Sequence, residues 1–236
     1  MIMPKLTVSN YPEMLRKLST ATFFVTIGCL VLLRTYIEPI EGALRHLDVF
    51  TPDIPVFGPV KIPFGTFVIA FVVAAISESI RLHNKISDVL KIRSEFDIRW
   101  ILFPMALLSA AVLTSAQFEK LQLERRRLMN EVFYAYASGT AGRQVIDPHM
   151  ITQALTTWSW YWLCAEAIAI IIPTAAILAF SSQFEWVSGL LTIVLVLLLV
   201  MRVFRIDCAM YAEAQVRETL SDTGRRQTVV AVFNAL

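Results

Sequence analysis

Apolar residues along this chain gather in five long blocks, separated by stretches rich in charged residues, proline or glycine. Each block has roughly the length that an α-helix needs to cross about 30 Å of hydrocarbon. Backbone polar groups inside a bilayer must be satisfied within their own segment, so each block is predicted to be helical. The blocks lie at residues 20–37, 62–80, 100–117, 158–180 and 186–204.

The first three connections differ in character. Residues 38–61 contain four prolines and two glycines, which predicts an irregular cap rather than a long helix. Residues 81–99 are charged but carry apolar residues near helical period, so we expect an amphipathic helix that continues from the second block. Residues 118–138 contain neither glycine nor proline and many strong helix formers, which predicts a helix that extends the third block.

The remaining connections are shorter. Gly139 and Gly142 predict the end of a helix, and a turn begins at Asp147. Residues 183–185 are expected to form a tight hairpin between the last two blocks. The tail is predicted to be helical and charged over 205–223, and it ends in an apolar segment, residues 228–236.

The distribution of Lys and Arg favours four membrane spans over five. If the third block packs as a re-entrant or tilted helix, four blocks cross and both termini are cytoplasmic. Eighteen of the 21 basic residues then lie on the cytoplasmic side. Five spans with the N-terminus outside place only thirteen there, although the third block is long enough to cross. The first block lacks a small-residue cleavage site and is expected to be a retained anchor.

These features predict an all-α polytopic membrane protein, a bundle of four or five transmembrane helices of which some extend into a small cytoplasmic helical domain. That domain is expected to be too small for an independent hydrophobic core with an active site. The expected organisation is a first transmembrane hairpin with a Pro-rich outer loop (1–80), a basic cytoplasmic region that includes the third block (81–157), a second hairpin (158–204) and a helical tail (205–236).

Composition supports the membrane assignment. Apolar residues make up 56% of the 236 residues, charged residues only 17%, and the mean hydropathy is +0.62. These values exclude an ordinary soluble enzyme, a disordered protein and a disulfide-rich secreted module. The net charge of +2 gives no support for nucleic-acid binding. Cys29, Cys164 and Cys208 are odd in number and show no CxxC spacing, so we expect buried core residues rather than disulfides or a zinc site.

Glu166 is the most informative single residue, because it lies well inside the fourth apolar block. An ionised carboxylate is unfavourable there, so it should face the bundle interior, be paired or be protonated. One interpretation is an ion or proton site or a pore-lining acid. The other is a buried carboxyl group that fixes helix packing through a hydroxyl or Trp partner. No second acid or histidine lies near Glu166 in the sequence, so a proton relay is not indicated.

Two further charged residues lie in or beside the apolar blocks. Arg34 is near the outer end of the first block, where a long basic side chain usually reaches the interface. Pairing of Arg34 with Glu166 or Glu38 is the alternative. Glu78 lies near the inner end of the second block and is expected to form an interfacial ion pair with Arg81.

The aromatic run Trp158, Trp160 and Trp162 stands at the start of the fourth block. Trp favours the boundary between membrane and water, so these residues are predicted to be interface anchors rather than a ligand cage.

Basic residues cluster in the segments assigned to the cytoplasm. Three interpretations are open: attraction to anionic lipid headgroups, docking of an acidic soluble partner, or direct binding of a nucleic acid. The last is disfavoured because acidic residues alternate with the basic ones, as on a solvated, salt-bridged helix pair. The candidates are Lys91, Arg93, Lys120, Arg125, Arg126 and Arg127.

No catalytic, phosphate-binding or metal-binding motif is present in the sequence. His46, His83 and His149 lie in three different connections without metal-ligand spacing. We therefore expect no enzymatic activity, no cofactor and no metal.

The leading hypothesis is a non-enzymatic scaffold or sensor of the plasma (inner) membrane. It would contact membrane lipids, form homo-oligomers, and present the basic helices and the apolar tail to a soluble cytoplasmic protein. The layout of a small multi-span protein with a basic cytoplasmic face is found in membrane components of bacterial defence or stress signalling, and equally in many other inner-membrane proteins. The second hypothesis is an ion-conducting pore or membrane-disrupting effector lined by Glu166, and the third is a small-solute transporter.

Overall fold

The chain is almost entirely helical, as the sequence predicts, with one pair of short strands. Two compact units make up the fold, and each is described by itself. The bundle unit comprises Tyr11–Lys85 and Ser159–Val203, and the short-helix unit comprises Met1–Asn10, Ile86–Trp158 and Phe204–Leu236. This computed structural model describes residues 7–48, 55–57, 60–109, 114–137 and 145–236.

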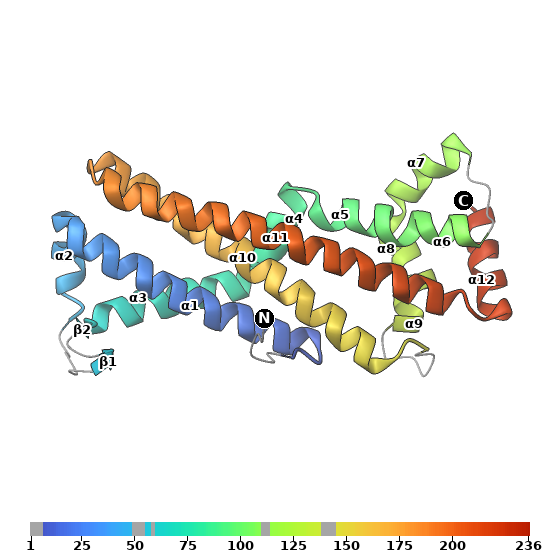
Figure 1. Cartoon of the computed structure of the whole chain (residues 1–236), viewed down its shortest axis with the longest axis horizontal. Coiled ribbons are helices and arrows are strands. Elements are labelled where there is room, and N and C mark those ends of the chain that lie inside the picture. The colour runs from blue at the N-terminus through green and yellow to red at the C-terminus, as the bar shows by residue number, and fades with distance from the viewer. Residues whose placement is uncertain (1–6, 49–54, 58–59, 110–113, 138–144) are drawn as a thin grey trace. The chain divides into compact units, whose positions relative to one another are not determined.

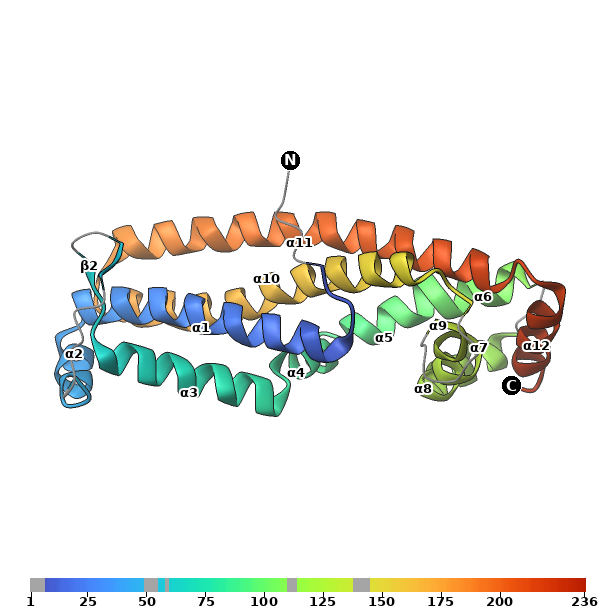
Figure 2. The same cartoon turned by 90° about the horizontal axis from the view of Figure 1, so that it is seen from below.

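Long helices dominate the bundle unit (Figures 1 and 2). Helices α1 and α3 lie side by side and run in opposite directions, joined by α2 and the strand pair. Helices α4, α10 and α11 contribute residues to both units. The elements are α1 (Tyr11–Tyr36), α2 (Glu38–Arg45), β1 (Pro55–Phe57), β2 (Val60–Lys61), α3 (Phe64–Ile80), α4 (Leu82–Val89), α10 (Pro148–Phe180) and α11 (Phe184–Thr219).

Three helices of the described chain are long and apolar enough to cross a membrane: α1, α10 and α11. Helices α3 and α4 meet the same criterion together, although they are bent by 57°, which raises the number to four. The first, fourth and fifth apolar blocks therefore form long helices as predicted. Within the described residues of the third block, 100–109 and 114–117, no helix meets this criterion.

Small side chains allow α1 and α3 to approach closely. The buried positions of α3 include Thr66, Ala70, Ala74 and Ser77, which recur every three or four residues along one face. Such a stripe brings helix backbones together where large side chains would separate them. Farther along α1, an apolar cluster joins three helices of the bundle unit and consists of Cys29, Ala167, Ile171 and Val194.

The connection after α3 is not the continuous helix expected from the sequence. Arg81 has φ 51° and Lys91 has φ 54°, both in the left-handed region that favours glycine. Each ends a hydrogen-bonded run, so residues 81–99 contain the separate helices α4 and α5 (Ile92–Phe96). The apolar period of the segment is helical, but its backbone turns twice.

The connection between α1 and α3 is more regular than predicted. Residues 38–45 form α2, with Pro39 in its first turn, where proline suits helix geometry. Part of the expected irregular cap, at 49–54 and 58–59, lies outside the described residues. The hairpin between α10 and α11 is confirmed, with its turn at Ser181–Gln183 and Ser182 at φ 59°.

The short-helix unit consists of brief helical segments. Two wide π-helical turns, η1 and η2, continue directly into α6 and α9, and they pack against each other. Besides α5, this unit contains η1 (Asp97–Leu102), α6 (Phe103–Leu108), α7 (Ser115–Leu123), α8 (Arg125–Leu128), η2 (Met129–Tyr134), α9 (Ala135–Ala137) and α12 (Thr223–Asn234).

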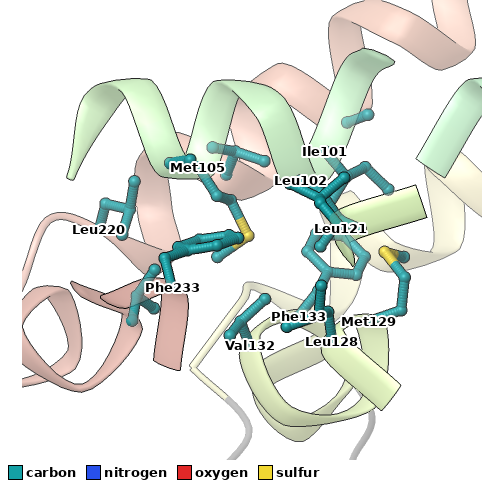
Figure 3. Close-up of a cluster of buried hydrophobic side chains, with 14 of the residues drawn as sticks. Ile101, Leu102, Met105, Leu121, Leu128, Met129, Val132, Phe133, Leu220 and Phe233 are labelled. Atoms are coloured by element: carbon teal, nitrogen blue, oxygen red, sulfur yellow. The ribbon is translucent and has the colours of Figure 1, made fainter. Parts of the chain in front are cut away.

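This unit has a hydrophobic core of its own, which corrects the expectation that the region is too small for one (Figure 3). Met105 from α6 points toward Phe233 from α12, and Leu102 points toward Leu121. The side chains of Leu102, Met105, Leu121 and Phe233 are all fully buried. The need to build this core therefore accounts for part of the apolar character of residues 100–117.

The helix over 118–138 does not extend the third block. Thr114 caps a new helix, α7, and its hydroxyl accepts a hydrogen bond from Gln117 N, while the Gln117 side chain accepts one from Thr114 N. This reciprocal cap starts a helix in its own direction. Residues 110–113 and the predicted stop at Gly139 and Gly142 lie outside the described residues.

The tail is helical as predicted, but its apolar end is not presented to solvent. Asp222 caps α12, and Val229, Phe233 and Leu236 are buried in the core. These three apolar side chains are therefore not presented to a partner as expected, and the docking role of 228–236 stays a prediction. The cysteines Cys29, Cys164 and Cys208 are free and buried, as expected.

Candidate functional site

A cluster of buried polar side chains surrounds Glu166 in the bundle unit. Glu166 lies in the interior of α10 and is 3% exposed. The Thr22 hydroxyl donates a hydrogen bond to Oε2 at 2.8 Å, and the Ser77 hydroxyl donates to the same oxygen at 3.4 Å. His83 Nδ1 lies 3.4 Å from the other oxygen, Oε1. Four helices thus converge on one carboxyl group.

The bend after α3 explains why a residue of a connecting segment reaches the bundle interior. Arg81 takes the left-handed conformation and donates its backbone N–H to the carbonyls of Ser77 and Glu78, which ends α3. The chain then turns by 57° into α4. His83 lies two residues after this turn and is 3% exposed, against the bundle rather than in solvent.

The second ring nitrogen of His83 has a different partner. Nε2 lies 3.0 Å from the Tyr11 hydroxyl, at the start of α1. The imidazole ring also packs against the rings of Tyr11 and Trp162, with centroids at 6.2 and 5.9 Å. Tyr11 is 37% exposed, whereas Trp162 is buried. One histidine therefore connects a partly exposed tyrosine to a buried carboxyl group.

The opposite side of the site is closed. The Thr26 hydroxyl donates a hydrogen bond to Thr22 O at 2.7 Å and so is occupied by the backbone of its own helix. Ala167, the next residue of α10, and Ile171, five residues on, belong to the apolar cluster with Cys29 and Val194. The polar chain thus ends within about one helical turn of Glu166.

This arrangement can hold more than one charge state. Two hydroxyl donors and an imidazole nitrogen surround the carboxylate, and such donors offset the unfavourable removal of a charge from water. Imidazole can donate or accept at either nitrogen, depending on which one carries the proton. No buried side-chain nitrogen or oxygen in the described part of the chain lacks a hydrogen-bond partner. Within the same residues, no group of three or more His, Cys, Asp or Glu could hold a metal ion.

A second polar cluster, the cap cluster, consists of Arg34, Glu41, Asp48 and Thr66. Arg34 Nε lies 2.6 Å from Glu41 Oε2, and Nη2 lies 2.5 Å from Asp48 Oδ2. Arg34 also donates to Thr66 Oγ1 at 3.2 Å. The hydrogen bond from Arg34 is the largest influence on Asp48 and holds the pKa of that carboxyl group below its ordinary value. Arg34 of α1 therefore connects α2, the turn that follows it and α3 through hydrogen bonds and ion pairs.

The outcome for Arg34 differs from both predicted alternatives. Its guanidinium group is 4% exposed rather than extended toward solvent, and its carboxylate partners are Glu41 and Asp48 rather than Glu166 or Glu38. Glu78 is exposed, and in the described part of the chain its carboxylate forms no ion pair with Arg81.

The predicted interface anchors lie in different surroundings. Trp162 is 2% exposed beside His83, so it is an interior residue of the bundle unit rather than a surface anchor. Trp158 is partly buried and packs against Phe96 in the short-helix unit, with ring centroids 4.9 Å apart. Trp160 is partly buried. The anchor role of Trp158 and Trp160 stays a prediction.

Several of the predicted basic residues are held by partners in the short-helix unit. Arg125 pairs with Asp97, which is 4% exposed. Burial raises the pKa of Asp97, and Arg125 opposes that rise. Arg93 donates to the Tyr134 hydroxyl at 3.1 Å.

The other basic candidates are more exposed. Arg127 lies between Glu124 and Glu131, and Lys120 donates to the carbonyl of Leu236. Lys91 and Arg126 are exposed, and neither forms an ion pair within the described residues. These two charges are therefore the most accessible of the six.

Sequence analysis identified Glu166 but missed Tyr11 and His83. The statement that no histidine lies near Glu166 holds along the sequence but is wrong in space, since 83 positions separate the two residues. The sequence feature that could have indicated His83 is its position directly after the second apolar block, where a short turn can place the side chain against the bundle.

Comparison with characterised proteins and with solved structures finds no match to this chain in either. The model of the YmfE protein family, in contrast, matches residues 10–233. This range includes both polar clusters of the bundle unit and nearly all of the short-helix unit. The chain therefore belongs to the YmfE protein family.

Proposed function

We propose that this chain is a non-enzymatic sensor of the plasma (inner) membrane. In this proposal the bundle unit crosses the bilayer, and the short-helix unit recruits a soluble protein in the cytoplasm. The Glu166 site is the switch. The pairing of Glu166 with His83 inside a bundle of apolar helices is the observation that carries the proposal. Ionisable residues at such positions are unfavourable for stability and are therefore functional candidates by default.

Two charge states of one buried group give two packing arrangements. An ionised Glu166 attracts the hydroxyl hydrogens of Thr22 and Ser77, whereas a protonated one becomes a donor itself. Because these partners come from α1 and α3, a change of charge acts on several helices at once. This property suits a switch better than a site that merely fixes packing.

The proposal uses four spans with both termini in the cytoplasm. The fourth span is the bent pair of α3 and α4, which passes the length and apolarity criterion only when taken together. The buried face of the third block, including Leu102 and Met105, supports leaving that block out of the count. Eighteen of the 21 basic residues then lie on the cytoplasmic side, in accord with the usual bias.

The recruiting surface is proposed to include Lys91 and Arg126, the accessible basic residues. Arg125 is excluded from this role because it neutralises buried Asp97. The proposal also includes homo-oligomers, for which α11 offers an apolar surface. Only 6% of its apolar window is buried in the chain itself, so lipid or a second copy must cover the remainder.

The test is gentle detergent purification of the full chain, followed by mass spectrometry of retained proteins and native mass of the complex. We expect a stoichiometric soluble partner that is lost when Lys91 and Arg126 are replaced by Glu. Arg217→Glu is the matched control, since Arg217 is an exposed arginine of the same unit. Glu166→Gln should change the amount of partner retained. Retention that is indifferent to all of these changes would refute the proposal.

A second candidate function, an ion-conducting pore, is favoured by the same carboxyl group. In that case Glu166→Gln should alter conductance in planar bilayers. The apolar cluster of Cys29, Ala167, Ile171 and Val194 next to the site argues for a closed end. We therefore rank the pore below the sensor, and the small-solute transporter stays third.

A further inference from the structure

We infer that the ligand of the Glu166 site is the proton, taken up on the Tyr11 side through His83. This inference rests on the proposed function, because it names the signal to which the switch responds. It goes further in assigning a route, a direction and a separate role to each of three side chains.

The three groups form a linear chain. The Tyr11 hydroxyl lies 3.0 Å from His83 Nε2, and His83 Nδ1 lies 3.4 Å from Glu166 Oε1. Each ring nitrogen therefore faces one neighbour, the phenol on one side and the carboxyl group on the other. An imidazole in this position can accept a proton at one nitrogen and release another from the opposite nitrogen.

Exposure decreases along the chain and gives the route a direction. Tyr11 is 37% exposed, whereas His83 and Glu166 are 3% exposed each. Tyr11 is thus partly open to the surroundings of the bundle unit, whereas Glu166 is enclosed. Under the proposed topology, the start of α1 faces the cytoplasm, so the site would respond to cytoplasmic pH.

The far side of Glu166 offers no continuation. Oε2 accepts hydrogen bonds from Thr22 and Ser77, and the apolar cluster begins at the next residue of α10, Ala167. A proton that reaches Glu166 must therefore leave by the same route. This geometry favours a titrating switch over a conducting path.

The charged and titratable neighbours of the site are few. Helix α1 contributes the Tyr11 phenol and the Thr22 hydroxyl, α3 contributes the Ser77 hydroxyl, and α4 contributes His83. Among the described residues, the one basic side chain in contact with Glu166 is His83, which is charged only when both ring nitrogens are protonated. Direct contacts of hydroxyls and imidazole with the carboxyl oxygens favour a proton, because a larger cation would first have to displace these donors.

The transfer balances in atoms and charge. In the starting state His83 is neutral, with its proton on Nδ1 toward Glu166, and Nε2 accepts the hydrogen bond from Tyr11. The Tyr11 hydroxyl passes its proton to Nε2 and takes a replacement from water. The N–H bond at Nδ1 then breaks as an O–H bond forms at Glu166 Oε1. The end state has a neutral imidazole protonated at Nε2 and a neutral carboxylic acid, with one proton taken up from solution.

The test uses the full chain in lipid nanodiscs and pH-difference infrared spectroscopy, in which a protonated carboxylic acid has its own C=O band. Acidification should produce a band in the unaltered protein that is absent in Glu166→Gln. Glu78→Gln is the matched control, because Glu78 is an exposed carboxyl group at the end of α3, and it should retain the band. A band that persists unchanged in Glu166→Gln overturns the inference.

Two further variants test the route and keep the inference refutable if Glu166→Gln fails to fold. Tyr11→Phe keeps the ring at a partly exposed position and removes only the hydroxyl. After a pH jump it should slow the appearance of the carboxylic acid band by about tenfold or more without changing its final amplitude. His83→Gln should slow it further, because it removes the imidazole that lies between the phenol and the carboxyl group. Rates equal to those of the unaltered chain in both variants refute the route.

The two proposals fail in different ways. If Glu166→Gln changes partner retention but the infrared band is absent from the unaltered protein, the sensor stands and the proton assignment fails. If the band is present but partner retention is the same at all pH values and in Glu166→Gln, the proton site stands and the sensor function fails.

Discussion

Replacing Arg125 by Gln should destabilise the short-helix unit strongly, although Arg125 lies among three consecutive arginines. Its guanidinium group is 15% exposed and pairs with Asp97, whose side chain is 6% exposed. Removal of one partner from a buried ion pair leaves an uncompensated charge and lowers stability by about 3–5 kcal/mol. For a domain of this size, such a loss lowers the melting temperature by on the order of 10 °C or more.

The pH dependence of this loss identifies its cause. Burial raises the pKa of Asp97, and Arg125 lowers it, so the variant should have a still higher pKa at this position. A carboxyl group whose pKa is higher in the folded than in the unfolded chain makes stability fall as the pH rises through that interval. The variant should therefore be least stable at neutral pH. It should recover toward the unaltered protein as the pH falls through the raised pKa of Asp97 and the carboxyl group becomes protonated.

The assay is thermal unfolding of the full chain in detergent at neutral and at acidic pH, monitored by tryptophan fluorescence. Trp100 and Trp158 report on the short-helix unit, since both pack against its core. Arg126→Gln is the matched control, because this neighbouring side chain is exposed, and its effect should stay within about 0.5 kcal/mol. Equal melting temperatures for Arg125→Gln and Arg126→Gln at neutral pH would refute the assignment of a buried ion pair.

Three further predictions concern other parts of the chain. Leu102→Asp should unfold the short-helix unit, whereas Leu107→Asp should be tolerated, because Leu102 is fully buried and Leu107 is 67% exposed; a spanning third block would instead penalise both by about 2.5–3.5 kcal/mol on membrane insertion. Gly65→Ala should lower the free energy of unfolding of the bundle unit by about 1–3 kcal/mol, and with it the melting temperature, because the added Cβ would lie 2.9 Å from Asp48 Oδ1. The pKa of Asp48 is lowered in the folded chain, so its pairing stabilises the cap cluster at neutral pH, and that contribution is lost as the pH falls through the lowered value. Asp48→Asn should therefore lower the melting temperature at neutral pH and have little effect in strong acid; a constant difference at every pH would contradict this account.

Sequence patterns were sufficient for features that depend on neighbours along the chain. The long apolar helices, the hairpin at Ser182 and the buried position of Glu166 all follow from local apolarity and helical period. The third block shows where this reasoning stops. Apolarity alone does not distinguish a helix that faces lipid from one whose face packs against Phe233 at the far end of the chain.

Partners at long range were not predictable in the same way. The snorkelling and pairing alternatives considered for Arg34 did not include Glu41 or Asp48, because their approach depends on the fold of α2. The sequence places His83 in a connection between apolar blocks. The left-handed turn at Arg81 redirects the chain so that His83 contacts Glu166. A non-glycine residue in that conformation leaves no reliable mark in a single sequence.

The π-helical turns η1 and η2 have a consequence for how this family can change in length. A π turn accommodates one residue more than an α-helical turn, and such turns are positions where a helix gains or loses a residue without breaking. Deletion of one residue before Glu166 in α10 would rotate the side chains on one side of the deletion by about 100° relative to those on the other. Glu166 would then no longer face its partners. The loss of one exposed residue within Asp97–Leu102 or Met129–Tyr134 can instead be absorbed by relaxation to a regular helix, which keeps the buried residues of these turns in place. Natural length variation among relatives should therefore concentrate in the short-helix unit, while the spacing along α10 is inherited unchanged.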